Sequence, residues 1–304
     1  MANDKTALEA RIDSGGSLLL AEISPPKGSD AARLQAVAKK FAGKVHALGV
    51  SDSRDGVSMS AVAAAALVAQ EGVEPLLHLT TRDRNRIALI SDSLGAAALG
   101  VRNILLTSGT HQTLGPARAA RNVYDVDSVQ LLLALAGLGT NASIVGQGGL
   151  NGAGSYCLGA VAAPFADPLE LQVSRVSKKI GAGAQFLITQ SVFDVERFEG
   201  WWREVVRCGL HKKAAFVAGI RILTSAKEAT ELSTRRPVPR IPAAMIERLS
   251  AKSSNAQRAE GIAIAVETAC KLASLEGLRG ISIRVDRDED AALEVVAQTG
   301  RGNA

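Results

Sequence analysis

Three polar side chains suited to chemistry stand at or near the ends of apolar runs: Glu22, His78 and Gln190. Glu22 follows the run Leu18–Ala21, where a carboxylate costs several kcal/mol unless it is paired. Burial favours the protonated carboxyl group, so we expect the pKa of Glu22 to rise, as suits a general acid near neutral pH. The residues alone leave a second interpretation open, in which Glu22 is a structural partner of Lys27 or of a basic residue on a neighbouring strand.

The other polar residues at strand ends carry weaker signals. A histidine in an apolar run such as that around His78 is more often a core residue than a catalyst. Gln190 ends another run, and its amide can donate and accept hydrogen bonds at once, which suits a heterocycle. Ser108 and Gly109 follow a third run, where small residues allow a ligand to approach the backbone.

An alternation of strands and helices would bring these side chains together. The predicted strands are near-continuous apolar runs, typical of parallel strands buried on both faces, at Leu18–Ile23, Lys44–Val50, Glu74–Thr80, Arg102–Thr107, Tyr156–Ala162, Gln185–Gln190, Ala214–Ile220 and Gly280–Val285. The predicted helices are Asp30–Ala42, Ser58–Glu71, Asp83–Leu99, Asp127–Leu138, Pro168–Ile180, Val195–Cys208, Ser225–Ser233, Asn255–Glu276 and Glu289–Thr299. This order predicts an α/β fold, a (β/α)8 TIM barrel, in which catalytic groups lie at the carboxyl ends of the strands.

We expect one domain over residues 1–304, with residues 1–16 as a polar N-terminal extension. The segment Gly139–Gly154 is rich in glycine, and we interpret it as a surface loop rather than a phosphate cradle. The predicted helix N-caps are Asp30, Ser58, Asp83, Asp127, Asp194 and Ser225. The predicted helix stops are Gly72, Gly100, Gly181, Gly209 and Gly277.

Composition narrows the function classes. The cysteines Cys157, Cys208 and Cys270 are far apart, which argues against a disulfide framework, a metal site or an iron–sulfur cluster. No apolar run approaches the roughly 20 residues of a membrane span, and the polar N-terminus does not resemble a signal peptide, so we expect a cytoplasmic protein. The net charge of +5 is scattered, and aromatic residues make up only 3%. These features favour an anionic small molecule over nucleic acid as the partner.

Several motifs, taken in order from about Glu22 to Arg287, resemble the methylenetetrahydrofolate reductase family. The sequence Glu-Ile-Ser-Pro-Pro-Lys begins at Glu22, and His-Leu-Thr begins at His78. The later pieces are Gly100–Leu105 with Ser108-Gly109, Gly181–Gln185 with Ile188–Asp194, Gly219-Ile220 and Arg240–Pro242. Each piece is weak alone, but the ordered set at matching strand ends is specific.

The resemblance implies a flavoprotein oxidoreductase of one-carbon metabolism and methionine biosynthesis, carrying FAD, with FMN as the alternative. Such an enzyme reduces methylenetetrahydrofolate to methyltetrahydrofolate. Glu22 matches the general acid that opens the folate ring to an iminium, which then takes a hydride from reduced flavin. Gln190 matches the residue that positions folate, and Glu228 and Arg287 match further substrate contacts. The cofactor contacts implied by the resemblance are Ser51, His78, Ser108, Gly109, Thr110, Tyr124, Asp125 and Lys179.

One departure from the family pattern concerns Thr110. The family has an acid there that tunes the flavin, and Thr110 carries no charge. Glu22, Asp52 or Asp55 would then compensate, or the flavin would be held differently. The alternative is a flavin-independent enzyme that passes hydride from NADH directly to folate.

The chain resembles the short, barrel-only form of the family, in which NAD(P)H or a partner subunit supplies electrons. The segments Val50–Ser53 and Thr110–Gln112 look closer to reductases of anaerobic pathways, which a small zinc protein or electron-transfer subunit accompanies. A further alternative is therefore a barrel subunit that is active only within a larger electron-transfer complex. A homo-oligomer is expected.

Overall fold

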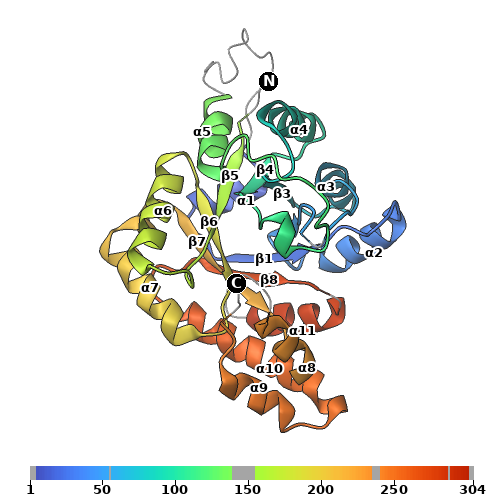
Figure 1. Ribbon diagram of the computed structural model, residues 1–304, viewed down its shortest axis with the longest axis vertical. Coiled ribbons are helices and arrows are strands. Elements are labelled where there is room, and N and C mark those ends of the chain that lie inside the picture. The colour runs from blue at the N-terminus through green and yellow to red at the C-terminus, as the bar shows by residue number, and fades with distance from the viewer. Residues whose placement is uncertain (1–4, 55, 139–154, 235–239, 287, 301–304) are drawn as a thin grey trace.

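The computed structural model describes residues 5–54, 56–138, 155–234, 240–286 and 288–300. Eight parallel strands close into a barrel in the order of the sequence, and β1 pairs with both β2 and β8. The strands are β1 Leu18–Ile23, β2 Ala47–Val50, β3 Pro75–Thr80, β4 Asn103–Thr107, β5 Cys157–Ala162, β6 Phe186–Ser191, β7 Ala215–Arg221 and β8 Gly280–Arg284. All eight predicted strands are confirmed, and the chain folds as a (β/α)8 TIM barrel (Figure 1).

Helices surround the barrel and bury its outer face. They are α2 Ala31–Phe41, α3 Ala61–Gln70, α4 Arg86–Ala98, α5 Ser128–Leu138, α6 Leu169–Gly181, α7 Val195–Arg207, α10 Ser254–Ala273 and α11 Glu289–Thr299. Their apolar faces and the outward-facing strand residues form one large core cluster. Short 3-10 helices lie at Gln112–Leu114 and Leu210–Lys212. None of the described helices is both long and apolar enough to cross a bilayer.

Two further helices lie between β7 and α10. These are α8, Ala226–Ser233, and α9, Ala243–Ser250, of which the sequence predicted only the first. With α10 they enclose a small core of their own, formed by Phe193, Leu223, Ala229, Leu232, Leu249 and Ile264. This places the beginning of α8 beside the carboxyl end of β7, at the mouth of the barrel (Figure 1).

The barrel interior is filled by every second residue of the strands. A second apolar cluster contains Leu18 and Leu20 of β1, Leu76 of β3 and Phe186 of β6, among others. Space for the Phe186 ring comes from Gly159 on β5, because a Cβ there would lie 2.2 Å from the ring. The interior is therefore a packed core, and open space begins only above it, at the strand ends.

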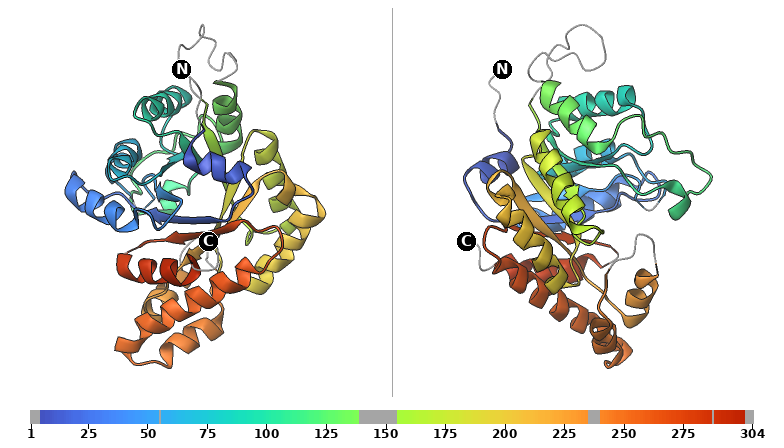
Figure 2. Two further views of the ribbon diagram at one scale, coloured as in Figure 1. Left: turned by 180° about the vertical axis from the view of Figure 1, so that it is seen from behind. Right: turned by 60° about the vertical axis from the view of Figure 1, so that its left-hand side comes forward.

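The helix α1, Ala7–Asp13, closes the opposite end of the barrel (Figure 2). Its Leu8 and Ile12 belong to the interior cluster, and Thr6 Oγ1 donates to Asn103 Oδ1 on β4 at 2.6 Å. The prediction of a polar extension over residues 1–16 was therefore wrong for residues 7–13. A helix of seven residues, of which two face the core, has too little periodicity to stand out in the sequence.

Replacing Leu8 tests this closure. We expect Leu8→Ala to lower the free energy of unfolding by about 2–5 kcal/mol, because Leu8 is fully buried and its removal leaves a cavity. Urea denaturation measures the change. Lys5→Ala, at an exposed ion pair with Asp13, serves as the control and should stay within about 0.5 kcal/mol of the wild type. Equal stability of Leu8→Ala and the wild type would contradict a structural role for α1.

The predicted caps are only partly confirmed. Asp30, Asp127, Asp194 and Ser225 each accept a backbone N–H from the following turn. The other two were wrong, because α3 begins after Ser60 rather than Ser58, and α4 is capped by Asn85. Asp83 instead accepts from Arg82 and Gln112.

Four of the five predicted helix stops, Gly72, Gly100, Gly209 and Gly277, have left-handed backbone angles. The fifth was wrong, because Gly181 is the last residue of α6 and Gly183 takes the positive φ. The segment Gly139–Gly154 lies outside the described residues.

Candidate active site

Glu22 lies at the carboxyl end of β1, in register with Gly49 on β2 and Arg284 on β8. Only 13% of its side chain is exposed. Its carboxylate forms an ion pair with Arg54, which follows β2 in the loop leading to α3. The partner is therefore neither Lys27 nor a residue within a neighbouring strand, although Arg284 does face Glu22 from β8.

The charges around Glu22 decide its protonation in the unliganded protein. Burial raises the pKa of Glu22, but its neighbours Arg54, His78 and Arg284, of which Arg54 acts most strongly, together lower it by more, so the pKa lies below its ordinary value. The expected upward shift was therefore wrong for this arrangement, because the sequence did not reveal the guanidinium group of Arg54. At neutral pH the unliganded protein holds Glu22 as a carboxylate.

His78 points into the barrel from β3 and is buried. Burial lowers the pKa of its imidazole to about 4, so the ring is neutral at pH 7. Its Nε2 has no hydrogen-bond partner among the described residues. The ring needs Gly49 on β2, because a Cβ at that position would lie 2.7 Å from Nε2.

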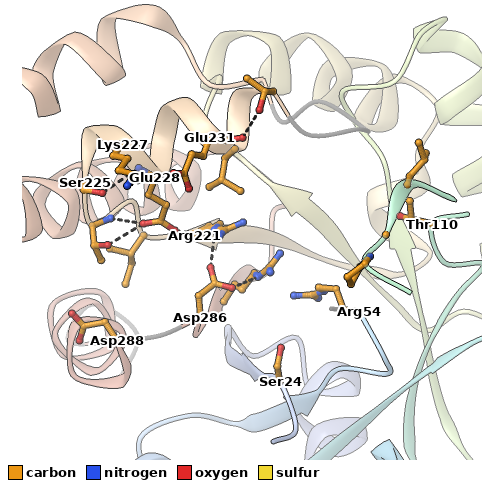
Figure 3. Close-up of a pocket in the computed structure, with 18 of the residues that line it drawn as sticks. Ser24, Arg54, Thr110, Arg221, Ser225, Lys227, Glu228, Glu231, Asp286 and Asp288 are labelled. Carbon is orange, nitrogen blue, oxygen red and sulfur yellow. Dashed lines mark hydrogen bonds and ion pairs between the residues drawn. The ribbon is translucent and has the colours of Figure 1, made fainter. Parts of the chain in front are cut away.

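A chain of alternating charges crosses the mouth of the barrel beside Glu22, and Figure 3 shows its members Asp286, Arg221 and Glu228. Arg284 Nε donates to Asp286 Oδ1 at 2.7 Å, and Asp286 Oδ2 lies 2.7 Å from Arg221 Nε. Arg221 Nη2 then donates to Glu228 Oε1 at 3.2 Å. The second oxygen of Glu228 accepts from the backbone N–H and the hydroxyl of Thr224, at 3.0 and 2.9 Å.

A cavity of about 1270 Å³ opens at this mouth. It extends from the loop Thr113–Pro116, past Arg82 and Arg54, to the beginning of α8. Basic side chains outnumber acidic ones in its lining. Sequence reasoning missed Arg54, Arg221, Arg284 and Asp286. Only Arg221 and Arg284 carried a signal, as basic residues at the ends of the seventh and eighth apolar runs.

The predicted substrate residues differ in their positions relative to the cavity. Glu228 lines the cavity, in the charge chain described above. Gln190 is half-buried near the end of β6, where the register with β7 shifts between Ile188 and Ser191, and it does not line the cavity. Arg287 lies outside the described residues.

Of the predicted cofactor residues, Thr110 alone lines the cavity. Ser51 donates its hydroxyl to Ser24 at 3.1 Å, and Ser108 donates to Ser128 at 3.2 Å. Gly109 has a φ of 77°, and a Cβ there would lie 2.3 Å from Thr80 Oγ1. Ser51, Ser108 and Gly109 are thus close to other residues of the protein, and none of them lines the cavity.

The remaining cofactor residues also have internal partners. Tyr124 donates to the Gly109 carbonyl at 3.5 Å. Asp125 accepts two hydrogen bonds from the guanidinium of Arg86, which lowers its pKa to about 2. Lys179 Nζ donates to the Val161 carbonyl at 2.5 Å, and burial lowers the pKa of this amine to about 8.

Comparison with known proteins agrees with the barrel and with the resemblance in the motifs. The chain is 27% identical over 156 residues to a probable methylenetetrahydrofolate reductase (NADPH) from Caenorhabditis elegans. That alignment covers 51% of this chain but only 22% of the nematode protein. A solved structure of an uncharacterized Clostridium thermocellum protein, which binds two copies of 5-methyl-5,6,7,8-tetrahydrofolic acid, has the same fold. Its TM-score is 0.68 at 13% identity, with 98% of this chain and 99% of that chain covered.

The family model for methylenetetrahydrofolate reductase matches residues 7–300, which include the helix that closes the barrel, every strand and the last helix, α11. A match of this extent includes both Glu22 and the charge chain at the mouth. The chain belongs to the methylenetetrahydrofolate reductase family.

Proposed function

We propose that this protein reduces 5,10-methylenetetrahydrofolate to 5-methyltetrahydrofolate, with Glu22 as the general acid. The observation that carries the proposal is the buried carboxylate of Glu22 at the mouth of a barrel of this family. The basic lining of the adjoining cavity suits folate, which is an anion. The folate ligand of the clostridial neighbour and the name of the nematode relative support the same substrate class.

The chemistry requires a proton before a hydride. Glu22 would donate its proton to N10 of the folate, and the bond between N10 and the bridging carbon would break. The bridging carbon then forms an iminium with N5 and accepts a hydride, which yields the methyl group. Glu228, which lines the cavity, is proposed to position the folate, whereas the folate contact of Gln190 stays a prediction from the resemblance. Proton donation of this kind contributes about 10²–10⁴ in rate.

The source of the hydride depends on whether the chain holds a flavin. FAD stays a prediction from the resemblance, with FMN as its alternative. One feature favours a flavin: His78 Nε2 has no hydrogen-bond partner among the described residues, so it could bond to the ring system of a flavin. Two observations argue against a flavin. Asp125 and Lys179 already have partners within the protein. The guanidinium of Arg82 donates to the carbonyls of Thr110 and Ser53.

As arranged, these residues do not fit a flavin. Most of their side chains are engaged by other protein groups, and of the set only Thr110, which lacks a charge, lines the cavity. We therefore propose hydride transfer directly from a reduced nicotinamide to the folate. The flavin-dependent reaction is the second candidate. A barrel that is active only with an electron-transfer subunit is the third, and turnover by the isolated chain would contradict it.

An absorption spectrum of the purified protein separates the first two candidates. For direct transfer we expect no visible flavin bands, and NADH- or NADPH-dependent reduction of methylenetetrahydrofolate without added flavin. Mass spectrometry of the denatured sample identifies any released cofactor. Recovery of one flavin per chain, together with loss of activity when it is removed, would decide for the flavin enzyme.

Three further expectations from the sequence stay predictions. They are the cytoplasmic location, the homo-oligomer and the small zinc-protein partner. Among the residues that the structure describes, no cluster of histidine, cysteine, aspartate or glutamate side chains has the geometry of a metal site.

A further inference from the structure

The contact between Glu22 and Arg54 conflicts with the role proposed for Glu22. A general acid must hold a proton when the substrate is bound. In the unliganded protein the ion pair with Arg54 favours the carboxylate, which has no proton to donate. Either the pair persists and Glu22 is no acid, or the pair separates when the folate binds.

The groups that face Glu22 come from different parts of the fold. Arg284 belongs to β8, which pairs with β1 and β7, and its guanidinium is bound to Asp286. The Asp286 carboxylate is shared with Arg221, so these two cations are partly neutralised where they stand. His78 is uncharged at neutral pH.

Arg54 differs from these groups in place and exposure. It stands in the irregular segment between β2 and α3, and 32% of its side chain is exposed. The segment before it is anchored, because Asp52 accepts from the Thr80 N–H and pairs with Arg84, and the Ser53 carbonyl accepts from Arg82. Separation from Glu22 would therefore be a rotation of the Arg54 side chain, with the residues before it held in place.

Arg54 both pairs with Glu22 and borders the open space. Arg54 and Arg284 line the cavity, whereas Glu22 does not. Figure 3 shows the Arg54 side chain extending into the cavity toward Asp286. A folate ring in the cavity could reach the Glu22 carboxylate only after Arg54 has moved.

From this geometry we propose that Arg54 is a removable counter-ion of Glu22: it pairs with the carboxylate in the empty site and is displaced by the folate ring. The inference rests on the proposed function and makes Arg54 a positioning residue. Once Arg54 has moved away, burial has the larger effect on Glu22 and favours its protonated form, because the charge of Arg284 is already paired with Asp286. Glu22 then takes one proton from solvent, donates it to N10 as the carbon–N10 bond breaks, and ends as the carboxylate.

The pH dependence of the kinetics tests the proposal. The pH profile of kcat/KM reports the free enzyme, and that of kcat reports the substrate complex. For the wild type we expect kcat/KM for the folate to fall about tenfold for each pH unit above the low pKa of free Glu22, while kcat begins to fall only at a higher pH. In Arg54→Gln the decline of kcat/KM should begin at a higher pH, because burial acts on Glu22 without the opposing cation.

Two companion variants separate this effect from a loss of folding. Arg54→Lys keeps the positive charge and should retain the wild-type profile. Arg197→Gln is the matched control, because it also removes a guanidinium that is 32% exposed from a carboxylate, Asp167, without touching Glu22 or the segment that holds Arg54. Its kcat/KM should keep the wild-type dependence on pH. If Arg54→Gln and Arg197→Gln both give the wild-type profile, the proposal is overturned.

A binding experiment without turnover gives an independent measurement. Calorimetry with 5,10-methylenetetrahydrofolate and no nicotinamide, in two buffers of different ionisation enthalpy, counts the protons taken up. We expect close to one proton at neutral pH for the wild type, and none for Glu22→Gln. Binding without proton uptake by the wild type would refute the role of Arg54 but leave the proposed reaction standing. Failure of the wild type to bind or reduce the folate would refute the proposed function itself.

Discussion

Glu22→Gln is expected to lower kcat for methylenetetrahydrofolate reduction by about 10²–10⁴, the usual contribution of general-acid catalysis. Glutamine has nearly the shape of protonated glutamate but cannot donate its proton to N10. The change also breaks the ion pair with Arg54, but Arg54 is 32% exposed and its guanidinium can be solvated, so the folded protein should be retained. The measurement is the steady-state rate at saturating folate, with KM determined separately to show that binding persists.

A second carboxylate provides the control for this effect. Glu74 accepts a hydrogen bond from Asn103 Nδ2 at 2.6 Å, at the end of the barrel opposite the cavity. Glu74→Gln should therefore leave kcat within a factor of about two.

A double variant tests whether Arg54 acts through Glu22. Glu22→Gln combined with Arg54→Gln should have the same pH profile of kcat/KM as Glu22→Gln alone, because the carboxylate on which Arg54 acts has been removed. A Glu22→Gln enzyme with normal turnover would assign the proton donation to another group.

Phe186→Ala is expected to lower the free energy of unfolding by about 3–5 kcal/mol, the range for deleting a buried aromatic ring. Phe186 is fully buried at the centre of the barrel and shares the interior cluster with Leu20 and Leu76. Denaturation by urea with two optical probes would measure the loss. Leu171→Ala, at a side chain that is 42% exposed on α6, is the control and should cost much less.

The neighbouring glycine tests the same packing from the other side. In Gly159→Ala the added methyl group would overlap the Phe186 ring, so we expect a loss of about 1–3 kcal/mol from overpacking. In a Phe186→Leu background the smaller side chain leaves room, and Gly159→Ala should then cost less than in the wild type. Additive effects of the two changes would show that the ring and the methyl group do not compete for one space.

How far the sequence predicted the site can be judged from Glu22 and its neighbours. The position of Glu22 after four apolar residues placed it at a strand end, and the structure confirms this. The predicted direction of its pKa shift was wrong, because the decisive cation, Arg54, lies in a loop 32 residues further along the chain. No local pattern distinguishes Arg54 from the other arginines of the sequence.

The cofactor residues show the same limit. Matching motifs named Asp125 and Lys179 as contacts of a flavin, and nothing in the local sequence reveals their internal partners. Arg86 and the Val161 carbonyl engage these side chains through contacts between segments distant in the chain. Whether a side chain is available to a ligand depends on what else it contacts, and this is a property of the tertiary structure.

The sequence by itself determined the alternation of strands and helices, because buried parallel strands need continuous apolar runs and helices need caps and amphipathic faces. It also placed Glu22 at the mouth of the barrel, since closure of eight strands brings all their carboxyl ends to one side. Only the tertiary structure decided that Arg54 pairs with Glu22 and lines the cavity, and that Arg221, Asp286 and Arg284 form a charge chain beside it. The physical reason is that electrostatic contacts act through space between residues whose separation in the sequence carries no information about their distance.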